Sequence, residues 1–161
     1  MSEEIRISPI GFVKVINNRQ MLVINKEFIE AMDGLDGFSH INVLWWCNLF
    51  DNSEYRNILT SEQPYKNAPE KLGIFATRAP IRPNPVALTT VSLIGIDKKT
   101  GEIHVDYIDA EEGTPIIDIK PYYPCSDRVK NVTTPEWSSG WPAWREDSAH
   151  FDWSSVFINA R

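Results

Sequence analysis

Val86-Ala-Leu-Thr-Thr-Val-Ser-Leu-Ile-Gly-Ile96 is followed by Asp97-Lys-Lys-Thr-Gly101 and then by Glu102-Ile-His-Val-Asp-Tyr-Ile108. The first and third segments are rich in β-branched residues, and the third alternates apolar with polar side chains. Such alternation is typical of a strand with one buried face, and a short polar turn that ends in glycine joins antiparallel neighbours. This stretch therefore predicts a β-hairpin.

Several other short apolar runs, separated by turn residues, are also predicted to be strands. A short helix is expected over about 26–32, with Asn25 as its N-cap. Short strands at close spacing with one early helix indicate a mainly β fold, a small closed or nearly closed antiparallel β-barrel. The predicted strands are 5–16, interrupted at Pro9-Ile-Gly11, then 21–24, 41–47 and 116–119.

Two stretches lack a regular pattern. Residues 48–71 are polar and are expected to form a long loop with one helical turn near 55–59, and long loops are often functional. The tail holds four of the six tryptophans and is interrupted by prolines, so we expect irregular structure that buries its rings. The chain is predicted to be one domain, 1–161, with 125–161 as a C-terminal extension packed on it.

Composition limits the class of protein. The chain has 161 residues, 42% of them hydrophobic, with a net charge of −6. An acidic chain lacks the clustered cations that nucleic-acid phosphates require, unless one face is locally basic. Two distant cysteines, no apolar leader and no long apolar run predict a cytoplasmic protein with reduced thiols and no membrane span.

The most unusual segment is Gly73-Ile-Phe-Ala-Thr-Arg-Ala-Pro-Ile-Arg-Pro-Asn-Pro85. Its prolines fix φ and remove backbone donors, so it is expected to be a rigid loop between two strands. Arg78 and Arg82 project from it, and paired guanidinium groups suit an anionic or carboxylate-bearing ligand. Thr77 and Asn84 add hydrogen-bonding groups. A structural crossover with surface arginines fits the composition equally well.

A second segment, 107–122, places Glu112-Gly113-Thr114-Pro115 as a tight turn between two apolar strands. Asp118 is expected to be half-buried and paired with Lys120 or with an arginine of the proline-rich loop. Asp109 either belongs to a similar ion pair or holds a ligand hydroxyl or cation. The histidines are widely spaced and predict no metal site.

Three segments together resemble the TsaA/YaeB-like (TrmO-type) family of S-adenosylmethionine-dependent tRNA methyltransferases. They are Gly34-Leu-Asp-Gly-Phe-Ser-His-Ile41, the proline-rich loop 73–85, and Asp109-Ala-Glu-Glu-Gly-Thr-Pro-Ile-Ile-Asp-Ile-Lys-Pro-Tyr122. They occur in the family's order, and with the intervening strands they cover about residues 5–124.

The resemblance implies a small β-barrel, a homodimer, and S-adenosylmethionine bound near the subunit interface. It implies methylation of the exocyclic nitrogen of threonylcarbamoyl-adenosine in tRNA, beside the anticodon. The cofactor-lining positions it implies are Arg78, Leu88, Tyr107, Ile108, Asp109, Asn48 and Leu49.

This sequence departs from the family at two places. Asn48-Leu49 stands where the family has a His-Gln pair, and Arg19-Gln20 is only a partial match to a Pro-Arg-Gln element. The methyl acceptor therefore stays open between tRNA and a small molecule, and a non-catalytic S-adenosylmethionine- or nucleoside-binding protein is a further alternative. No catalytic base is identified. Residues predicted to contact the acceptor are Arg82, Asn84, Lys120 and Arg128.

Overall fold

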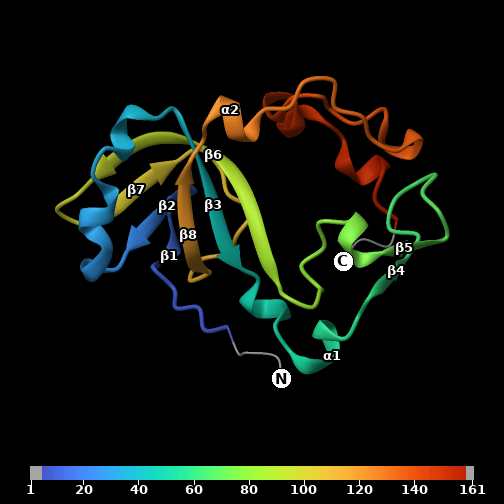
Figure 1. Cartoon of the computed structure of the whole chain (residues 1–161), viewed down its shortest axis with the longest axis horizontal. Helices are drawn as coiled ribbons and strands as arrows, with labels where there is room; N and C mark the ends of the chain where they lie inside the picture. Colours follow the sequence, from blue (N-terminus) through green and yellow to red (C-terminus); the bar gives the residue numbers. More distant parts are fainter. Residues whose placement is uncertain (1–4, 159–161) are drawn as a thin grey trace. The chain divides into compact units, whose positions relative to one another are not determined.

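Strand β6 (Val86–Asp97) pairs along its length with two neighbours, and this pairing organises a barrel (Figure 1). The computed structural model describes residues 5–158, and within them six antiparallel strands close in the order β1-β2-β7-β6-β3-β8. The closed antiparallel barrel confirms the predicted fold class. The strands are β1 (Gly11–Ile16), β2 (Arg19–Ile24), β3 (His40–Trp46), β6 (Val86–Asp97), β7 (Glu102–Val105) and β8 (Pro115–Pro121).

The chain divides into two compact units. One, the barrel unit, comprises Met1–Asp51 and Pro85–Arg128, and the other, the second unit, comprises Asn52–Asn84 and Val129–Arg161. The predicted single domain with an extension at 125–161 stays a prediction, and its residues 1–4 and 159–161 lie outside the described part of the chain.

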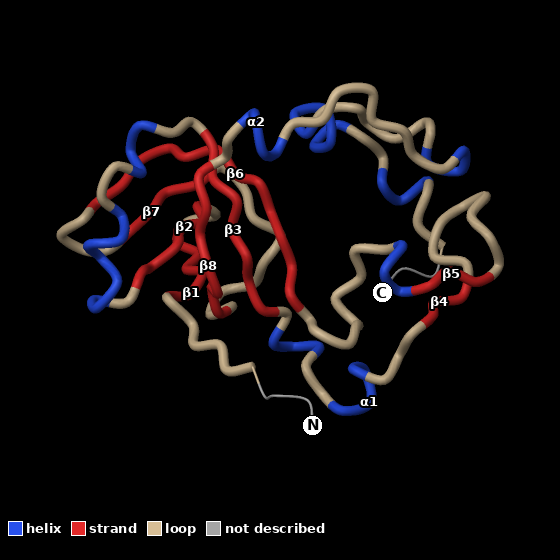
Figure 2. The backbone as a smooth tube through the Cα atoms, viewed as in Figure 1, coloured by secondary structure: helices blue, strands red, loops and turns tan. Residues whose placement is uncertain are grey.

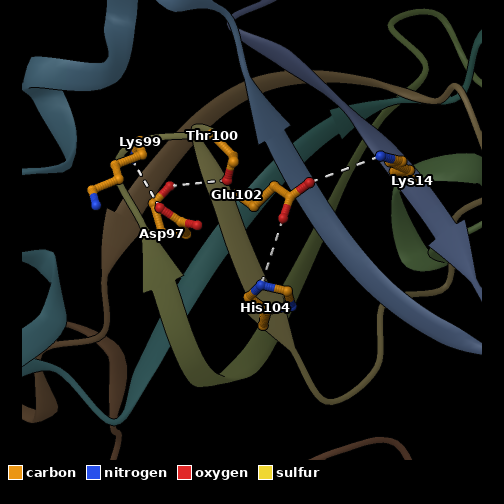
Figure 3. Close-up of polar contacts among 6 residues, drawn as sticks. All are labelled: Lys14, Asp97, Lys99, Thr100, Glu102 and His104. Atoms are coloured by element: carbon orange, nitrogen blue, oxygen red, sulfur yellow. Dashed lines mark hydrogen bonds and ion pairs between the residues drawn. The ribbon is translucent and has the colours of Figure 1, made fainter.

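Two hairpins set the register of the barrel. The β6–β7 hairpin forms as predicted: Asp97 pairs with Glu102, and the Asp97 carboxylate accepts a hydrogen bond from the Lys99 backbone N–H at 2.9 Å (Figure 3). The β1–β2 hairpin turns at Asn17 and Asn18, both with positive φ, 51° and 60°. Asparagine tolerates this left-handed conformation better than most residues, so the two-residue turn forms without glycine.

Successive side chains of a strand point to opposite faces, and those that point inward fill the barrel interior. Branched aliphatic side chains from several strands are buried together, and none of them carries a polar group. The fully buried members are Val13, Leu22, Ile41, Val43, Val91, Ile103, Ile108 and Ile116. Strand 41–47 is thus confirmed in position, and burial decreases toward its end, where Leu44, Trp45 and Trp46 are only half-buried.

Gly11, at the start of β1, marks a close approach of two backbones. A Cβ at this position would lie 2.2 Å from the Val23 carbonyl oxygen, which is too close for two atoms that are not bonded. Any residue other than glycine would therefore clash with the backbone here. The chain before Gly11 does not belong to β1, so the interruption predicted at Pro9-Ile-Gly11 is the actual start of the strand.

A short 3₁₀ helix (Lys26–Met32) follows β2 and buries Met32, which confirms the predicted position but not an α-helix. Asn25 is its N-cap residue, but its carboxamide makes no cap hydrogen bond and instead donates to the Pro9 carbonyl at 3.2 Å. The predicted N-cap position is therefore confirmed, but the expected side-chain hydrogen bond to the first turn is not formed. A second 3₁₀ turn (Leu35–Gly37) precedes β3.

The outer surface of the barrel carries ion pairs. Glu102 on β7 lies 3.8 Å from both the Lys14 amino group on β1 and the His104 imidazole (Figure 3). These groups are partly solvent-exposed, so such pairs contribute little to stability.

The second unit begins where a long loop was predicted. It contains α1 (Ser53–Arg56), close to the expected helical turn, and then the antiparallel pair β4 (Thr60–Glu62) and β5 (Lys71–Gly73) (Figure 2). The hairpin was missed because each strand is only three residues long and polar, with no alternation to detect. A 3₁₀ turn (Ile74–Ala76) then leads into the proline-rich loop.

The tail adds three 3₁₀ segments to the second unit, Glu136–Ser138, Arg145–His150 and Trp153–Ser155. Its rings pack around Tyr65, which lies between the two short strands. Trp137 stacks on the Tyr65 ring with centroids 5.2 Å apart, and Trp141 meets it edge-on at 5.0 Å. The expectation of an irregular tail is confirmed, but its rings are buried only in part: Trp137, Trp141 and Trp153 are half-buried, whereas Trp144 and Phe157 are 65% and 44% exposed.

The last element of the barrel unit, α2 (Pro124–Asp127), is held by a polar network around the buried Asn42. The Asn42 carboxamide, on β3, donates to the Asp127 carboxylate at 3.0 Å and accepts from the Thr90 hydroxyl at 2.7 Å. The other Asp127 oxygen accepts from the Tyr123 N–H at 2.7 Å. A buried amide is thereby satisfied, and the end of the barrel unit is fixed.

Candidate functional site

Residues 107–109 follow β7, and their side chains are exposed and buried in alternation. Ile108 is fully buried, whereas Tyr107 is 60% exposed and Asp109 is also exposed. The Tyr107 hydroxyl donates to the Asp109 carboxylate at 3.3 Å, so the two outward side chains lie together. Partial burial of the ring, followed by the charge and hydrogen bond of Asp109, raises the pKa of the Tyr107 hydroxyl. The hydroxyl therefore stays a neutral donor at physiological pH.

The turn that follows is fastened to β1. Gly113 has φ of +81°, and its N–H donates to the Val13 carbonyl at 2.7 Å. The Val13 N–H in turn donates to the carbonyl of Thr114, which is buried. The glycine of the Gly-Thr-Pro motif is thus required by its positive φ, and the motif joins the exposed segment to the barrel wall.

A side chain that sequence reasoning did not assign to the site holds the other end of this segment. The Gln20 carboxamide nitrogen donates to the carbonyls of Ile108 at 2.7 Å and Ala110 at 3.3 Å, and its oxygen accepts from the Ile108 N–H at 2.8 Å. The signal available in the sequence was only the partial match at Arg19-Gln20. Nothing in the sequence showed that Gln20 reaches a segment 88 residues away.

Leu88 lies on β6 opposite Leu44 of β3, and its side chain is 45% exposed. Asn48 and Leu49 form the 3₁₀ turn Asn48–Phe50 directly after β3, and both are exposed. The Cys47 N–H donates to the Pro85 carbonyl at 2.7 Å, which keeps the end of β3 beside the start of β6.

Arg78 belongs to the second unit, in a loop that its neighbours brace. Thr77 is buried, and its hydroxyl donates to the Ile74 carbonyl at 2.8 Å. Arg82 folds back so that one guanidinium nitrogen contacts the carbonyls of Thr77 at 3.2 Å and Ala79 at 3.4 Å. Arg78, between the braced residues, is exposed. The loop therefore presents one arginine and uses the other, at least in part, as internal support.

Tyr65 connects this loop to the aromatic cluster of the tail. Its ring is 8% exposed, and burial raises the pKa of its hydroxyl, while a hydrogen bond with the Arg78 backbone acts in the opposite direction. The main chain that carries Arg78 thus contacts a side chain whose position is set by Trp137 and Trp141.

The predicted acceptor-binding residues have different surroundings. Lys120 lies 2.8 Å from the Asp118 carboxylate, as predicted, and this hydrogen bond is the main cause of the raised pKa of Lys120. Arg128 is exposed and follows α2. Asn84 is exposed in the second unit.

His40 and the cysteines show no catalytic arrangement. Ser39 and Ser92 hydroxyls lie 2.9 and 3.3 Å from the two imidazole nitrogens of His40, which is the role of a satisfied structural histidine. Cys47 is buried and Cys125 is exposed, and neither forms a disulfide. Among residues 5–158, no group of three His, Cys, Asp or Glu side chains could hold a metal ion, and no helix is long and apolar enough to cross a membrane.

The predicted cofactor positions within the barrel unit form two groups. Tyr107, Ile108 and Asp109 are consecutive on one fixed segment, and Leu88 and Asn48-Leu49 lie on the paired strands β6 and β3 or just beyond them. Arg78, Arg82 and Asn84 belong to the second unit. Their roles toward a ligand stay predictions.

Comparison with known proteins identifies some relatives that this chain covers almost completely and longer ones that it covers only in part. A protein of Methanothermobacter thermautotrophicus named a probable S-adenosyl-L-methionine-binding protein is 41% identical over 74% of this chain and 91% of its own. A probable S-adenosyl-L-methionine-binding protein of Methanocaldococcus jannaschii is 44% identical over 71% of this chain and 89% of its own. The tRNA (adenine(37)-N6)-methyltransferase of Escherichia coli is 30% identical over 76% of this chain but only 52% of its own.

The fold comparison agrees. The crystal structure of TrmO from Pseudomonas aeruginosa superposes with a TM-score of 0.65 at 27% identity, covering 84% of this chain and 62% of that protein. This chain therefore spans only 52% of the Escherichia coli enzyme and 62% of the Pseudomonas aeruginosa TrmO. The model of the tRNA-methyltransferase O N-terminal domain family matches residues 5–128, more than half of the sequence, and the chain belongs to this family.

Proposed function

We propose that this protein binds S-adenosylmethionine and transfers its methyl group to an adenosine nitrogen in tRNA. The observation that carries the proposal is the match of residues 5–128 to the tRNA-methyltransferase O N-terminal domain, which includes the 73–85 and 109–122 motifs. Two archaeal relatives that this chain covers at 89% or more are named as probable S-adenosyl-L-methionine-binding proteins.

Three exposed side chains have the chemistry that this cofactor would require. S-adenosylmethionine is a zwitterion with a sulfonium cation, and it supplies an activated methyl group when bound. Tyr107 offers an electron-rich ring, and Asp109 an exposed carboxylate beside it, which together favour a cation. Arg78 is exposed on a braced loop and suits the carboxylate of the amino-acid moiety.

Methyl transfer from a sulfonium needs alignment more than a strong acid or base. The side chains described above accordingly bind and orient, and no catalytic dyad is required. Leu88, Asn48 and Leu49 are exposed and would contact the cofactor in this proposal, whereas Ile108, whose side chain is fully buried, would act by orienting Tyr107 and Asp109. The chain would then work as a homodimer, as the family resemblance implies, and in the cytoplasm, as expected from its cysteines and the lack of a long apolar run.

The acceptor we favour is the exocyclic nitrogen of threonylcarbamoyl-adenosine beside the anticodon. The overall charge of −6 argues against tRNA, but the charge is unevenly distributed. The ranges of the second unit hold eight basic and seven acidic residues, for +1, whereas those of the barrel unit hold eight and fifteen, for −7. Arg82, Asn84, Lys120 and Arg128 are the proposed acceptor contacts, with the first two in the less acidic unit.

A small-molecule acceptor is a second candidate, supported by a groove within the second unit. The groove has a volume of about 780 Å³, and Trp137, Trp141 and Phe151 contribute aromatic surface beside Lys66 and Glu136. Rings with a few charged groups at the rim are typical of small-ligand sites. A non-catalytic S-adenosylmethionine-binding protein is a third, because the methyltransferase relatives reported above extend well beyond this chain.

One experiment separates the three. The purified protein is incubated with methyl-labelled S-adenosylmethionine and either total tRNA lacking this methylation or a small-metabolite extract. We expect label in the tRNA, mapped to the modified adenosine beside the anticodon, and much less label with Arg78→Ala at the same concentration of S-adenosylmethionine. Label only in the metabolite fraction supports the second candidate. Calorimetric binding without transfer to either fraction supports the third, and no binding at all refutes the proposed function.

A further inference from the structure

The Gln20 carboxamide forms hydrogen bonds to the main chain of residues 107–110, the proposed cofactor segment, of the kind that a neighbouring strand would form. The β2–β7 ladder ends where Met21 pairs with His104, and beyond it the main chain of β2 offers no partner to 107–110. The Gln20 side chain continues the pairing instead. It donates to the Ile108 carbonyl at 2.7 Å and accepts from the Ile108 N–H at 2.8 Å, with a further donation to the Ala110 carbonyl at 3.3 Å.

This double contact fixes which residues of the segment face outward. Alternate residues of an extended chain point to opposite sides, so holding both polar groups of Ile108 sets the orientation of its neighbours. Ile108 is fully buried among the core residues, and Tyr107 and Asp109 are exposed on the other side, linked by their 3.3 Å hydrogen bond. A rotation of the segment about its own axis would exchange these positions.

The position of Gln20 is itself set by a short-range feature. The two-residue turn at Asn17 and Asn18 pairs Ile16 with Arg19 and Val15 with Gln20. Because the turn has only two residues, the register of β2 cannot slip without turning every side chain to the opposite face. The Gln20 side chain is half-buried and directed to Ile108 rather than to solvent.

We infer that Gln20 is a positioning residue for S-adenosylmethionine binding, which acts through the 107–109 segment and not on the ligand. The inference rests on the proposed function, since it takes Tyr107 and Asp109 to contact the cofactor. Preorganisation of this kind increases affinity because the segment need not be ordered when the ligand binds.

The test compares Gln20→Met, which preserves length and volume but removes the carboxamide, with the full-length protein. The matched control is Asn25→Leu, which removes a carboxamide at the other end of β2 whose nitrogen donates to the Pro9 carbonyl. Affinity for S-adenosylmethionine is measured by calorimetry, thermal unfolding by circular dichroism, and amide exchange of residues 107–110 by hydrogen–deuterium mass spectrometry.

We expect Gln20→Met to weaken S-adenosylmethionine binding roughly tenfold and to speed exchange over 107–110, with Asn25→Leu changing neither beyond about twofold. Gln20→Glu serves if the methionine variant does not fold, because a carboxylate still accepts from the Ile108 N–H but cannot donate to the two carbonyls. Unchanged affinity in a folded Gln20 variant overturns the inference. If the unmodified protein binds no S-adenosylmethionine, the proposed function has failed and the positioning role fails with it, even where the 107–110 exchange still responds.

Discussion

At the scale of single residues, each of the two units presents exposed side chains, which we propose as ligand contacts, next to residues that hydrogen bonds hold in place. Arg78, Tyr107 and Asp109 present their functional groups to solvent, and each lies next to a residue that is held in place. Ile108 is fixed by Gln20, and Thr77 by its own hydroxyl bond and by Arg82. This arrangement explains why substitutions at the exposed positions should change binding with little effect on stability, and substitutions at the supports should change both.

Arg78→Ala should weaken S-adenosylmethionine binding by about tenfold or more, because a charge-assisted contact with a carboxylate contributes about 1.5–3 kcal/mol. Its side chain is exposed, so the melting temperature should stay within about 1–2 °C of the original. Calorimetry and thermal unfolding check both values. Lys130→Ala removes an exposed cation from the same unit and should leave the affinity unchanged. Equal losses in the two variants would show that only general charge matters.

Gly11→Ala should destabilise the barrel by about 1–3 kcal/mol or more, since the added Cβ would lie 2.2 Å from the Val23 carbonyl oxygen. Urea unfolding followed by circular dichroism measures the difference. Gly95→Ala is the matched control, because a Cβ there meets nothing within 4 Å. A Gly11→Ala protein as stable as the control would contradict the close packing of β1 on β2.

At the scale of elements, the proline-rich loop and the tail are parts of one assembly within the second unit. The Lys66 N–H donates to the Val156 carbonyl at 2.8 Å, and Tyr65 forms a β-bridge with Phe157, so the tail extends the structure around β4 and β5. Tyr65 lies at the centre, with its ring against Trp137 and its hydroxyl at the Arg78 backbone. The tail, beyond the 5–128 family match, thereby supports a loop inside it.

The raised pKa of Tyr65 predicts a pH dependence of stability. In the unfolded chain the hydroxyl ionises near pH 10, whereas burial keeps it neutral to higher pH in the folded protein. Its contribution to stability is therefore complete below about pH 10 and decreases as pH rises through the folded pKa. Urea unfolding at about pH 8 and about pH 11 should show a larger loss for the original protein than for Tyr65→Phe. Parallel losses would contradict the assignment.

At the scale of the whole molecule, the barrel unit and the second unit differ in net charge. The barrel unit carries −7 and the second unit +1, so tRNA binding should depend on cations in the second unit in addition to the proposed contacts Lys120 and Arg128 of the barrel unit. Opposing charges within one chain also make the total of −6 a poor guide to its partners.

We expect tRNA binding to weaken steeply with salt, and Lys66→Glu with Lys71→Glu to weaken it further while S-adenosylmethionine affinity is kept. Both lysines are exposed in the second unit. Filter binding across a salt series measures the slope, and Lys26→Glu, an exposed lysine of the barrel unit, serves as the control. A salt-independent interaction, or equal losses in the control, would argue against tRNA contact through the second unit.

The sequence alone determined the β-hairpin at 86–108, the strand at 41–47, the rigid loop around Arg78 and the family resemblance, because alternation, prolines and motif order are local properties of the chain. It did not reveal the β4–β5 hairpin, whose strands are short and polar, or the carboxamide of Gln20 bound to Ile108. Nor did it show that Arg82 braces the loop from within. Only the tertiary structure decided these features, because each depends on polar groups that are close in space. The sequence pattern around these groups does not indicate which partners they will have.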